Sequence, residues 1–470
     1  MSDPPVPRAV SAAMAALQAA PASSAGRPTL WLSLSRAWSA AAAERSATAT
    51  AAAPPPDECH ERAYAACAAG LRELRPPSDL PAVAAVAPLC PAGDALSRGR
   101  VDALAALAAL PARAPLPLGH PSCSRIYVLS DLHVDQPLPW RCDCRLGPGD
   151  RTPPLRLGMD WVRALGSDAE GCLVVAGDVA DSLAATLTAL AELRRRFARV
   201  FYVPGNHDLF LRGADARAFP DSWCKLFALR RACAQLRVET APAAVATTPA
   251  ATAASSASDP AASSPLAPVV VAPLLSWYDD GDFCGGGGGQ DGGSPSTRLR
   301  YDAPCDWGAV RDADVHRVML SLGKRDLATA ARAAGEGGAA FLLTATHFLP
   351  RRELPYWPAL RAAMGNAALG ALVLPALRAA AVRPGGGAHV HCYGHSHRNG
   401  ERGDLGDEVL YVQHALGGGP EEEEGVGQRG GLRRRQDGDV RGACRCFAPR
   451  VVWRQVQDDG GGGGGSAPRR

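Results

Sequence analysis

From residue 125 onward, short apolar runs alternate with longer stretches in which apolar residues recur at helical spacing. The short runs are rich in β-branched residues and end in Gly, Pro or polar residues, a pattern typical of buried strands. We therefore expect strands in the segments RIYVLS, CLVVAGD, RVFYVPG, VVVAPLLSW, FLLTATH, HVHCYGH and VLYVQH. Strands alternating with helices in this way predict an α/β domain.

The stretch between the second and third predicted strands shows the helical pattern most clearly. Its leucines recur every three or four residues from Leu183 to Leu193, so they share one face of a helix. Asp181 or Ser182 can cap the start of this helix. The pattern predicts one βαβ crossover.

Before the strand-rich region, two Ala/Leu-rich stretches predict a helical appendage over residues 57–118. Residues 1–56 are rich in Ala and Ser and contain few acids. Two interpretations of this segment stay open: a disordered extension, or a transit-peptide-like leader to a chloroplast or mitochondrion.

Blocks of Gly, Pro, Ser and Thr interrupt the α/β region. They predict disordered insertions at about 241–267 and 281–296 and a low-complexity tail over 417–470. One apolar segment within that tail, PRVVWRQV at about 448–456, predicts a strand that returns to a sheet edge.

Charge and cysteine content narrow the possible partners and compartments. The 50 basic and 47 acidic residues give a net charge of +3, which argues against a nucleic-acid or membrane-surface partner. No apolar run reaches the length of about 18 residues that a spanning helix needs, so we expect a soluble protein. The 14 Cys lack the dense spacing of a disulfide framework, which favours reduced thiols inside a cell, in the cytoplasm if not in an organelle.

Acids, amides and imidazoles follow five of the predicted strands at the point where each strand ends. In open α/β folds the carboxyl ends of strands meet at one crevice, where ligands bind. The residues are Asp131 and His133; Asp178 and Asp181; Asn206, His207 and Asp208; His347; and His395 and His397.

Written as motifs, these residues read D-x-H, G-D-x-x-D, G-N-H-D, H and G-H-x-H in that order. The series resembles the calcineurin-like metallophosphoesterase superfamily, over about residues 126–417. The segments LLSWYDD, THFLPRREL and GHSHRNG are similar to an uncharacterised plant and algal branch of it. The resemblance implies a four-layer αββα sandwich of two mixed sheets flanked by helices over residues 119–416.

The resemblance also implies two divalent cations, Mn, Fe, Zn or Mg, holding a bridging hydroxide that attacks phosphorus in line. This is the chemistry of a phosphoric ester hydrolase. Asp178 would bridge the two metals. The remaining ligands would be Asp131, His133 and His397 for one metal and Asn206, His347 and His395 for the other.

Three further residues receive roles around the metals. His207 would assist the leaving group, oriented by Asp181, while Asp208 would anchor the loop. The guanidinium of Arg351 is a candidate contact for a substrate phosphate, and the alternative is that Arg351 and Arg352 form a solvated basic pair.

The activity has alternatives. Ser/Thr protein phosphatases carry Arg and Glu where this chain has Ser182 and Asp208, so a small phosphoester, monoester or diester, is the expected substrate. A nuclease-type phosphodiesterase is the second enzyme hypothesis, against which the balanced charge argues. A metal-free scaffold or interaction module of the same fold is the non-enzyme hypothesis, and the complete set of ligand-type residues argues against it.

Overall fold

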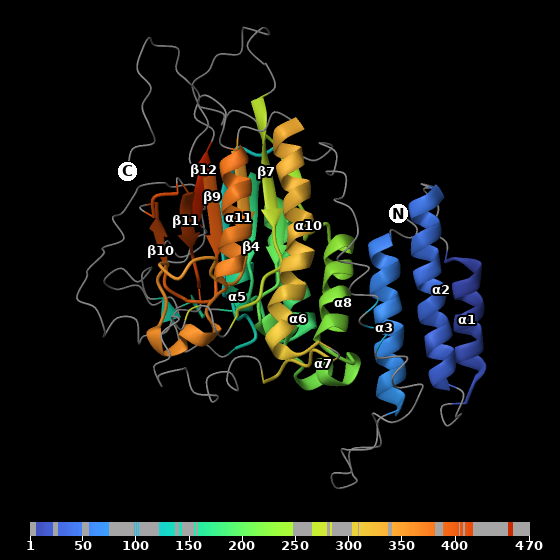
Figure 1. Cartoon of the computed structure of the whole chain (residues 1–470). Helices are drawn as coiled ribbons and strands as arrows, with labels where there is room; N and C mark the ends of the chain where they lie inside the picture. The colour runs from blue at the N-terminus through green and yellow to red at the C-terminus, as the bar shows by residue number, and fades with distance from the viewer. Residues whose placement is uncertain are drawn as a thin grey trace, which may run out of the picture.

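The structure is a computed structural model, and it describes the strand-rich region and most of the N-terminal helices (Figure 1). The described residues are 6–21, 27–48, 56–74, 98, 100, 102, 122–136, 141–142, 155–156, 158–247, 266–279, 283, 303–308, 310–336, 341–380, 389–403, 405–407, 409–416 and 450–454.

The first sheet has the strand order β12-β1-β4-β5. β1, β4 and β5 run parallel, and β12 pairs antiparallel with β1, so the sheet is mixed. β12 lies at the sheet edge that the apolar segment of the tail was expected to reach. The bounds are β1 (Arg125–Leu129), β4 (Asp168–Ala176), β5 (Phe197–Val203) and β12 (Arg450–Arg454).

The second sheet has the order β10-β11-β9-β8-β7-β6. Its four central strands are parallel, and β6 and β10 pair antiparallel at the two edges. The bounds are β6 (Ala243–Thr247), β7 (Leu266–Pro273), β8 (Phe341–Ala345), β9 (His389–Tyr393), β10 (Gly400–Arg402) and β11 (Val409–Gln413). A separate pair is formed by β2 (Arg141–Cys142) and β3 (Leu155–Arg156).

The two sheets pack face to face. Successive residues of a strand point to opposite faces of its sheet, so each sheet buries one face against the other sheet and the other face against helices. In β1, Ile126 and Val128 point to the core between the sheets, whereas Tyr127 and Leu129 point to the helices outside. Strands buried on both faces explain the continuous apolar runs in the sequence.

Helices cover the outer face of each sheet, which completes four layers and confirms the predicted αββα sandwich of two mixed sheets. α5 and α6 lie on the first sheet, and α10 and α11 lie on the second (Figure 1). α6 is the predicted crossover helix, and the Ser182 side chain caps it by accepting a hydrogen bond from the Ala185 N–H. The bounds are α5 (Met159–Ala164), α6 (Leu183–Arg196), α7 (Gly213–Ala218), α8 (Ser222–Gln235), α10 (Val315–Glu336) and α11 (Ala367–Ala380), with short 3₁₀ helices at η2 (His207–Leu209), η5 (Asp312–Asp314) and η6 (Pro358–Ala363).

Three N-terminal helices lie in a row next to α8, with α3 (Pro56–Leu74) against it, then α2 (Arg27–Thr48), and α1 (Arg8–Ala19) farthest from it (Figure 1). α3 falls within the predicted helical appendage, whose second stretch lies largely outside the described residues. Within residues 1–56, the structure has the helices α1 and α2. Leu34 and Trp38 are buried in a core shared with α3 and α8, and small alanines such as Ala42 let the helices approach closely. The targeting interpretation stays a prediction.

The first predicted insertion begins later than expected. Ala243–Thr247 form β6 because Ala243, Val245 and Thr247 alternate inward and are buried against the second sheet. The rest of that insertion, the second insertion and most of the tail lie outside the described residues.

Two expectations from composition can be compared with the structure. Among the helices described, none has both the length and the apolar composition needed to cross a bilayer. Among the cysteines whose side chains are described, Cys67, Cys172, Cys224, Cys233 and Cys392 are free thiols.

Candidate metal centre

The polar residues predicted from the strand ends converge at one edge of the sandwich. Parallel strands β1, β4 and β5 of the first sheet and β8 and β9 of the second all end there. A parallel bridge between Ser130 and Ala415 joins the two sheets next to this edge. Side chains from five separate segments therefore reach one place.

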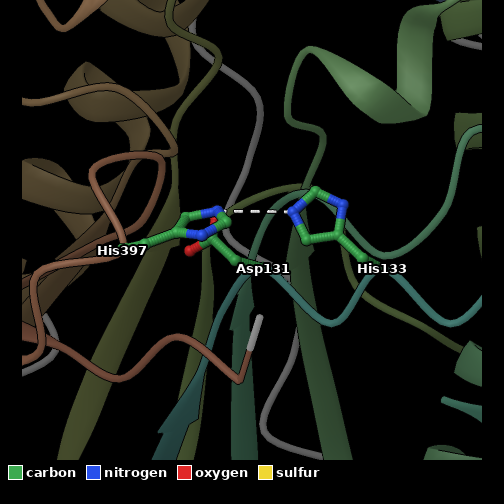
Figure 2. Close-up of side chains that lie close together, drawn as sticks. All are labelled: Asp131, His133 and His397. Atoms are coloured by element: carbon green, nitrogen blue, oxygen red, sulfur yellow. Dashed lines mark hydrogen bonds and ion pairs between the residues drawn. The ribbon is translucent and has the colours of Figure 1, made fainter. Parts of the chain in front are cut away.

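Asp131, His133 and His397 form the first group of possible ligands (Figure 2). His397 Nε2 lies 3.3 Å from Asp131 Oδ1 and 3.3 Å from His133 Nε2. Asp131 and His133 are buried, whereas the His397 side chain is 27% exposed. The structure thus brings these three predicted ligands together, with donor atoms close enough to bind one cation.

Asp178, His347 and His395 form a second group, and Asn206 lies with them. His347 Nε2 is 3.3 Å from Asp178 Oδ2, 3.1 Å from Asn206 Oδ1 and 3.2 Å from His395 Nδ1. All four residues are buried. This group matches the predicted ligand set of the other metal.

Asp178 lies between the two groups. Its Oδ2 atom is 3.3 Å from His347 Nε2 on one side and 3.9 Å from His133 Nε2 on the other. The same oxygen is 4.0 Å from His207 Nε2, so His133, Asp178 and His207 make a third group with ligand geometry. The position suits a bridging carboxylate, and it also allows His207 to act as a ligand.

The backbone of the centre is strained at five of these positions. Asp131, His133, Asp178, His395 and His397 all have positive φ, between 43° and 69°. In the part of the chain that the structure describes, the only other non-Gly residue of this kind is Arg237. Such conformations are rare for residues with a Cβ and gather at functional sites, where the surrounding fold holds them.

Glycines before the ligands give room for their approach. A Cβ on Gly205 would lie 2.1 Å from Asp178 Oδ1, and one on Gly177 would lie 2.3 Å from His347 Nδ1. A Cβ on Gly394 would lie 2.9 Å from Asp131 Oδ2. These close contacts explain the Gly in the G-D, G-N and G-H motifs.

The hydrogen bonds of the imidazoles favour a cation at the centre. His347 Nδ1–H donates to the Ala176 carbonyl at 2.9 Å, and His395 Nε2–H donates to the Ala363 carbonyl at 2.8 Å. In neutral His347, the Nε2 lone pair then faces the oxygens of Asp178 and Asn206. The lone pair and these oxygens repel each other. A divalent cation between them, like a proton, would remove the repulsion, so the donor set fits a metal.

The pKa directions agree with this arrangement. Burial lowers the pKa of His133 and of His395 to about 3, which leaves both rings neutral and able to bind a metal. Burial also opposes charge on Asp178 and on His347, but the attraction between the two charged groups outweighs it. The pKa of His347 therefore rises to about 9, and the pKa of Asp178 lies well below its usual range. The centre therefore attracts positive charge strongly.

His207 has its own set of partners. Its Nδ1 is 2.6 Å from Asp181 Oδ1 and 3.2 Å from the Gln136 amide nitrogen. The Phe210 ring packs on the imidazole at 4.5 Å, and the Arg212 guanidinium lies over Phe210 and pairs with Asp181. Burial opposes the protonation of His207, but the carboxylates of Asp178 and Asp181 outweigh it and raise the pKa.

Asp208 anchors the loop, as predicted. Its carboxylate accepts hydrogen bonds from the backbone N–H groups of Asp178, Val179, Ala180 and Gly205, at 2.8 to 3.3 Å. One side chain thus joins the loops after β4 and β5, and it supports the turn at Asn206.

Arg351 is engaged elsewhere. Its guanidinium pairs with Asp407 and with Glu353, and its side chain is only 20% exposed. The predicted phosphate contact by Arg351 would require a substrate to displace these carboxylates. Sequence reasoning missed three other residues around the His207–Asp181 pair, since none belongs to a motif. Gln136 and Lys225 reach the site from separate segments, and Arg212 lies in the loop after η2.

Three comparisons with known proteins gave a family match and a similar solved structure. Residues 124–241 match the family model of calcineurin-like phosphoesterases, a range that includes the motifs after β1, β4 and β5. Comparison with curated proteins gave no match. Among solved structures, a phosphopantetheinyl hydrolase from Mycobacterium tuberculosis is 20% identical, with 74% of this chain and 100% of that chain covered and a TM-score of 0.43.

Proposed function

We propose that this chain, which carries a calcineurin-like phosphoesterase domain, is a metal-dependent hydrolase of small phosphoesters. The observation that carries the proposal is the convergence of seven ligand-type side chains from five strand ends. Asp131, His133 and His397 would hold one divalent cation, and Asn206, His347 and His395 the other, with Asp178 shared between them. When bound, the cations would supply an activated water nucleophile and neutralise charge on the phosphate.

His207 is the proposed proton donor to the leaving group. Asp181 accepts the hydrogen bond from Nδ1 and so fixes the ring, whose Nε2 faces Asp178 and the centre. A proton on Nε2 would pass to the leaving-group oxygen as the P–O bond breaks. The Phe210 ring limits rotation of the imidazole by packing on it.

The test is metal analysis of the purified full chain together with a panel of phosphomonoesters, phosphodiesters and single-stranded nucleic acid. We expect two divalent metals per chain and turnover of small esters. Nucleic acid as the preferred substrate would instead favour the nuclease hypothesis. A folded protein without metal or hydrolysis would favour the scaffold hypothesis.

A further inference from the structure

Lys225 is a buried cation beside the catalytic loops that no motif indicated. It lies in the first turn of α8, and its side chain is 0% exposed. An ammonium group has three N–H donors, and burial without partners would be strongly unfavourable. The contacts of this group therefore show what it does in the fold.

The three contacts of Lys225 Nζ lead to two loops. It donates to the carbonyl of Asp181 at 2.7 Å and to the carbonyl of Phe210 at 2.7 Å. It also pairs with Asp215 Oδ2 at 2.9 Å, and the same oxygen accepts the Leu183 N–H at 2.8 Å. All three donors are used.

These contacts surround the His207–Asp181 pair. Asp181 holds the ring of His207 through its side chain, while Lys225 holds Asp181 through its main chain. Phe210 follows His207 by three residues and packs on its ring. The neighbouring Ser222 hydroxyl donates to the Leu209 carbonyl, so the start of α8 holds the same loop at a second point.

We propose that Lys225 is a positioning residue that sets the distance between His207 and Asp181 by binding both of their loops. The part of this proposal that concerns turnover rests on the proposed function. Displacements of about 1 Å in a catalytic pair can lower the rate by up to about 10²-fold. Lys225 would thus act on proton donation without touching the substrate.

The main variant is Lys225→Arg. It keeps the positive charge beside Asp215 but replaces the three tetrahedral N–H donors of the ammonium by the planar donors of a guanidinium. We expect both metals to be kept, KM to change little, and kcat on an alkyl ester to fall about 10- to 100-fold. On a nitrophenyl ester the fall should be smaller, because that leaving group needs no proton. The matched control is Arg231→Met, which removes a cation of α8 that faces Glu61 on α3, and it should leave kcat unchanged.

A second measurement does not depend on activity. The His207 ring N–H proton, assigned by its loss in His207→Ala, should show the downfield resonance of a short hydrogen bond in the full chain. Lys225→Arg should shift or broaden it. An unshifted resonance, or equal loss of kcat on both esters, would overturn the proposal. If the wild type hydrolyses no ester, the proposed function fails, and the resonance alone decides the role of Lys225.

Should Lys225→Arg fail to fold, the double variant K225M/D215N removes both buried charges together and avoids an unpaired carboxylate. The same two readouts apply to it. Combined with His207→Ala, a change at Lys225 should lower kcat on the alkyl ester no further, because both act through one proton transfer. A full additional loss in the combined variant would contradict the proposal.

Discussion

The two sides of the candidate metal centre differ in their exposure to solvent. On the closed side, Asn206, His347 and His395 are buried, and the rings of His347 and His395 are held by main-chain carbonyls. On the open side, the side chains of His397 and His207 are 27% and 22% exposed. The difference indicates that a substrate would approach from the open side, while the closed side maintains the structure of the centre.

The largest effect is expected from a change at Asp178, which lies between the two sides. Asp178→Asn removes the charge of a carboxylate that lies between the two sides, so we expect loss of both metals and hydrolysis below detection. Elemental analysis and activity assays check this. The matched control is Asp168→Asn at the opposite end of β4, which should keep both metals. Two metals per chain in the Asp178 variant would contradict the shared role.

On the open side, His207→Ala should separate catalysis from metal binding. We expect both metals to stay bound and turnover of an alkyl ester to fall by ~10²- to 10⁴-fold, as for a lost general acid. A nitrophenyl ester should be affected less. Asp181→Asn should give a milder form of the same pattern because it disturbs only the orientation of the ring.

Two results would count against this role of His207. Loss of a metal in His207→Ala would mean that His207 is a ligand, as the third group of donors allows. Equal losses on the alkyl and nitrophenyl esters would favour charge stabilisation over proton donation.

A direct comparison of the sides uses His347→Ala and His397→Ala in metal-free protein. His347 is fully buried, and its removal leaves a cavity and takes a hydrogen-bond donor from the Ala176 carbonyl, so the free energy of unfolding should fall by about 2 to 4 kcal/mol. For the partly exposed His397 we expect a change within about 1 kcal/mol. Urea unfolding in chelator measures both, and equal losses would remove the distinction between the sides.

The smallest effect on turnover is expected from a segment that belongs to neither side. Deletion of residues 1–53 removes α1 and α2; α1 packs on α2, and α2 packs on α3 rather than on the centre. We expect kcat to stay within about twofold, while the melting temperature falls by roughly 4 °C or more. Loss of kcat in a folded truncated protein would show that these helices act on the site.

Much of the candidate centre could be predicted from the sequence because each candidate ligand follows its strand within a few residues. The apolar run before Asp178 predicts the strand, and the parallel sheet then brings its end next to those of its neighbours. The contacts of Lys225 and Arg212 could not be predicted in this way. They depend on how α8 and the loop after η2 pack, and no local pattern encodes that packing.

The N-terminal helices show a different limit. The core positions of α2 include Ala41 and Ala42, and such Ala-rich stretches resemble unstructured extensions in composition. What stabilises α1 and α2 is their packing on a core that includes α8, which lies far along the chain. Arg351 illustrates the converse case, since its neighbours His347 and Arg352 suggested a substrate contact, while Asp407 from a distant segment engages it.

The positive φ angles in the centre set stability against function. His133, His395 and His397 adopt a conformation that costs roughly 1 kcal/mol or more for a residue with a Cβ, and that Asn and Gly adopt more readily. Without metal, His397→Asn should therefore be as stable as the native chain or slightly more so. Selection for stability alone would replace these histidines over time, so their retention would mark descendants that still use the site.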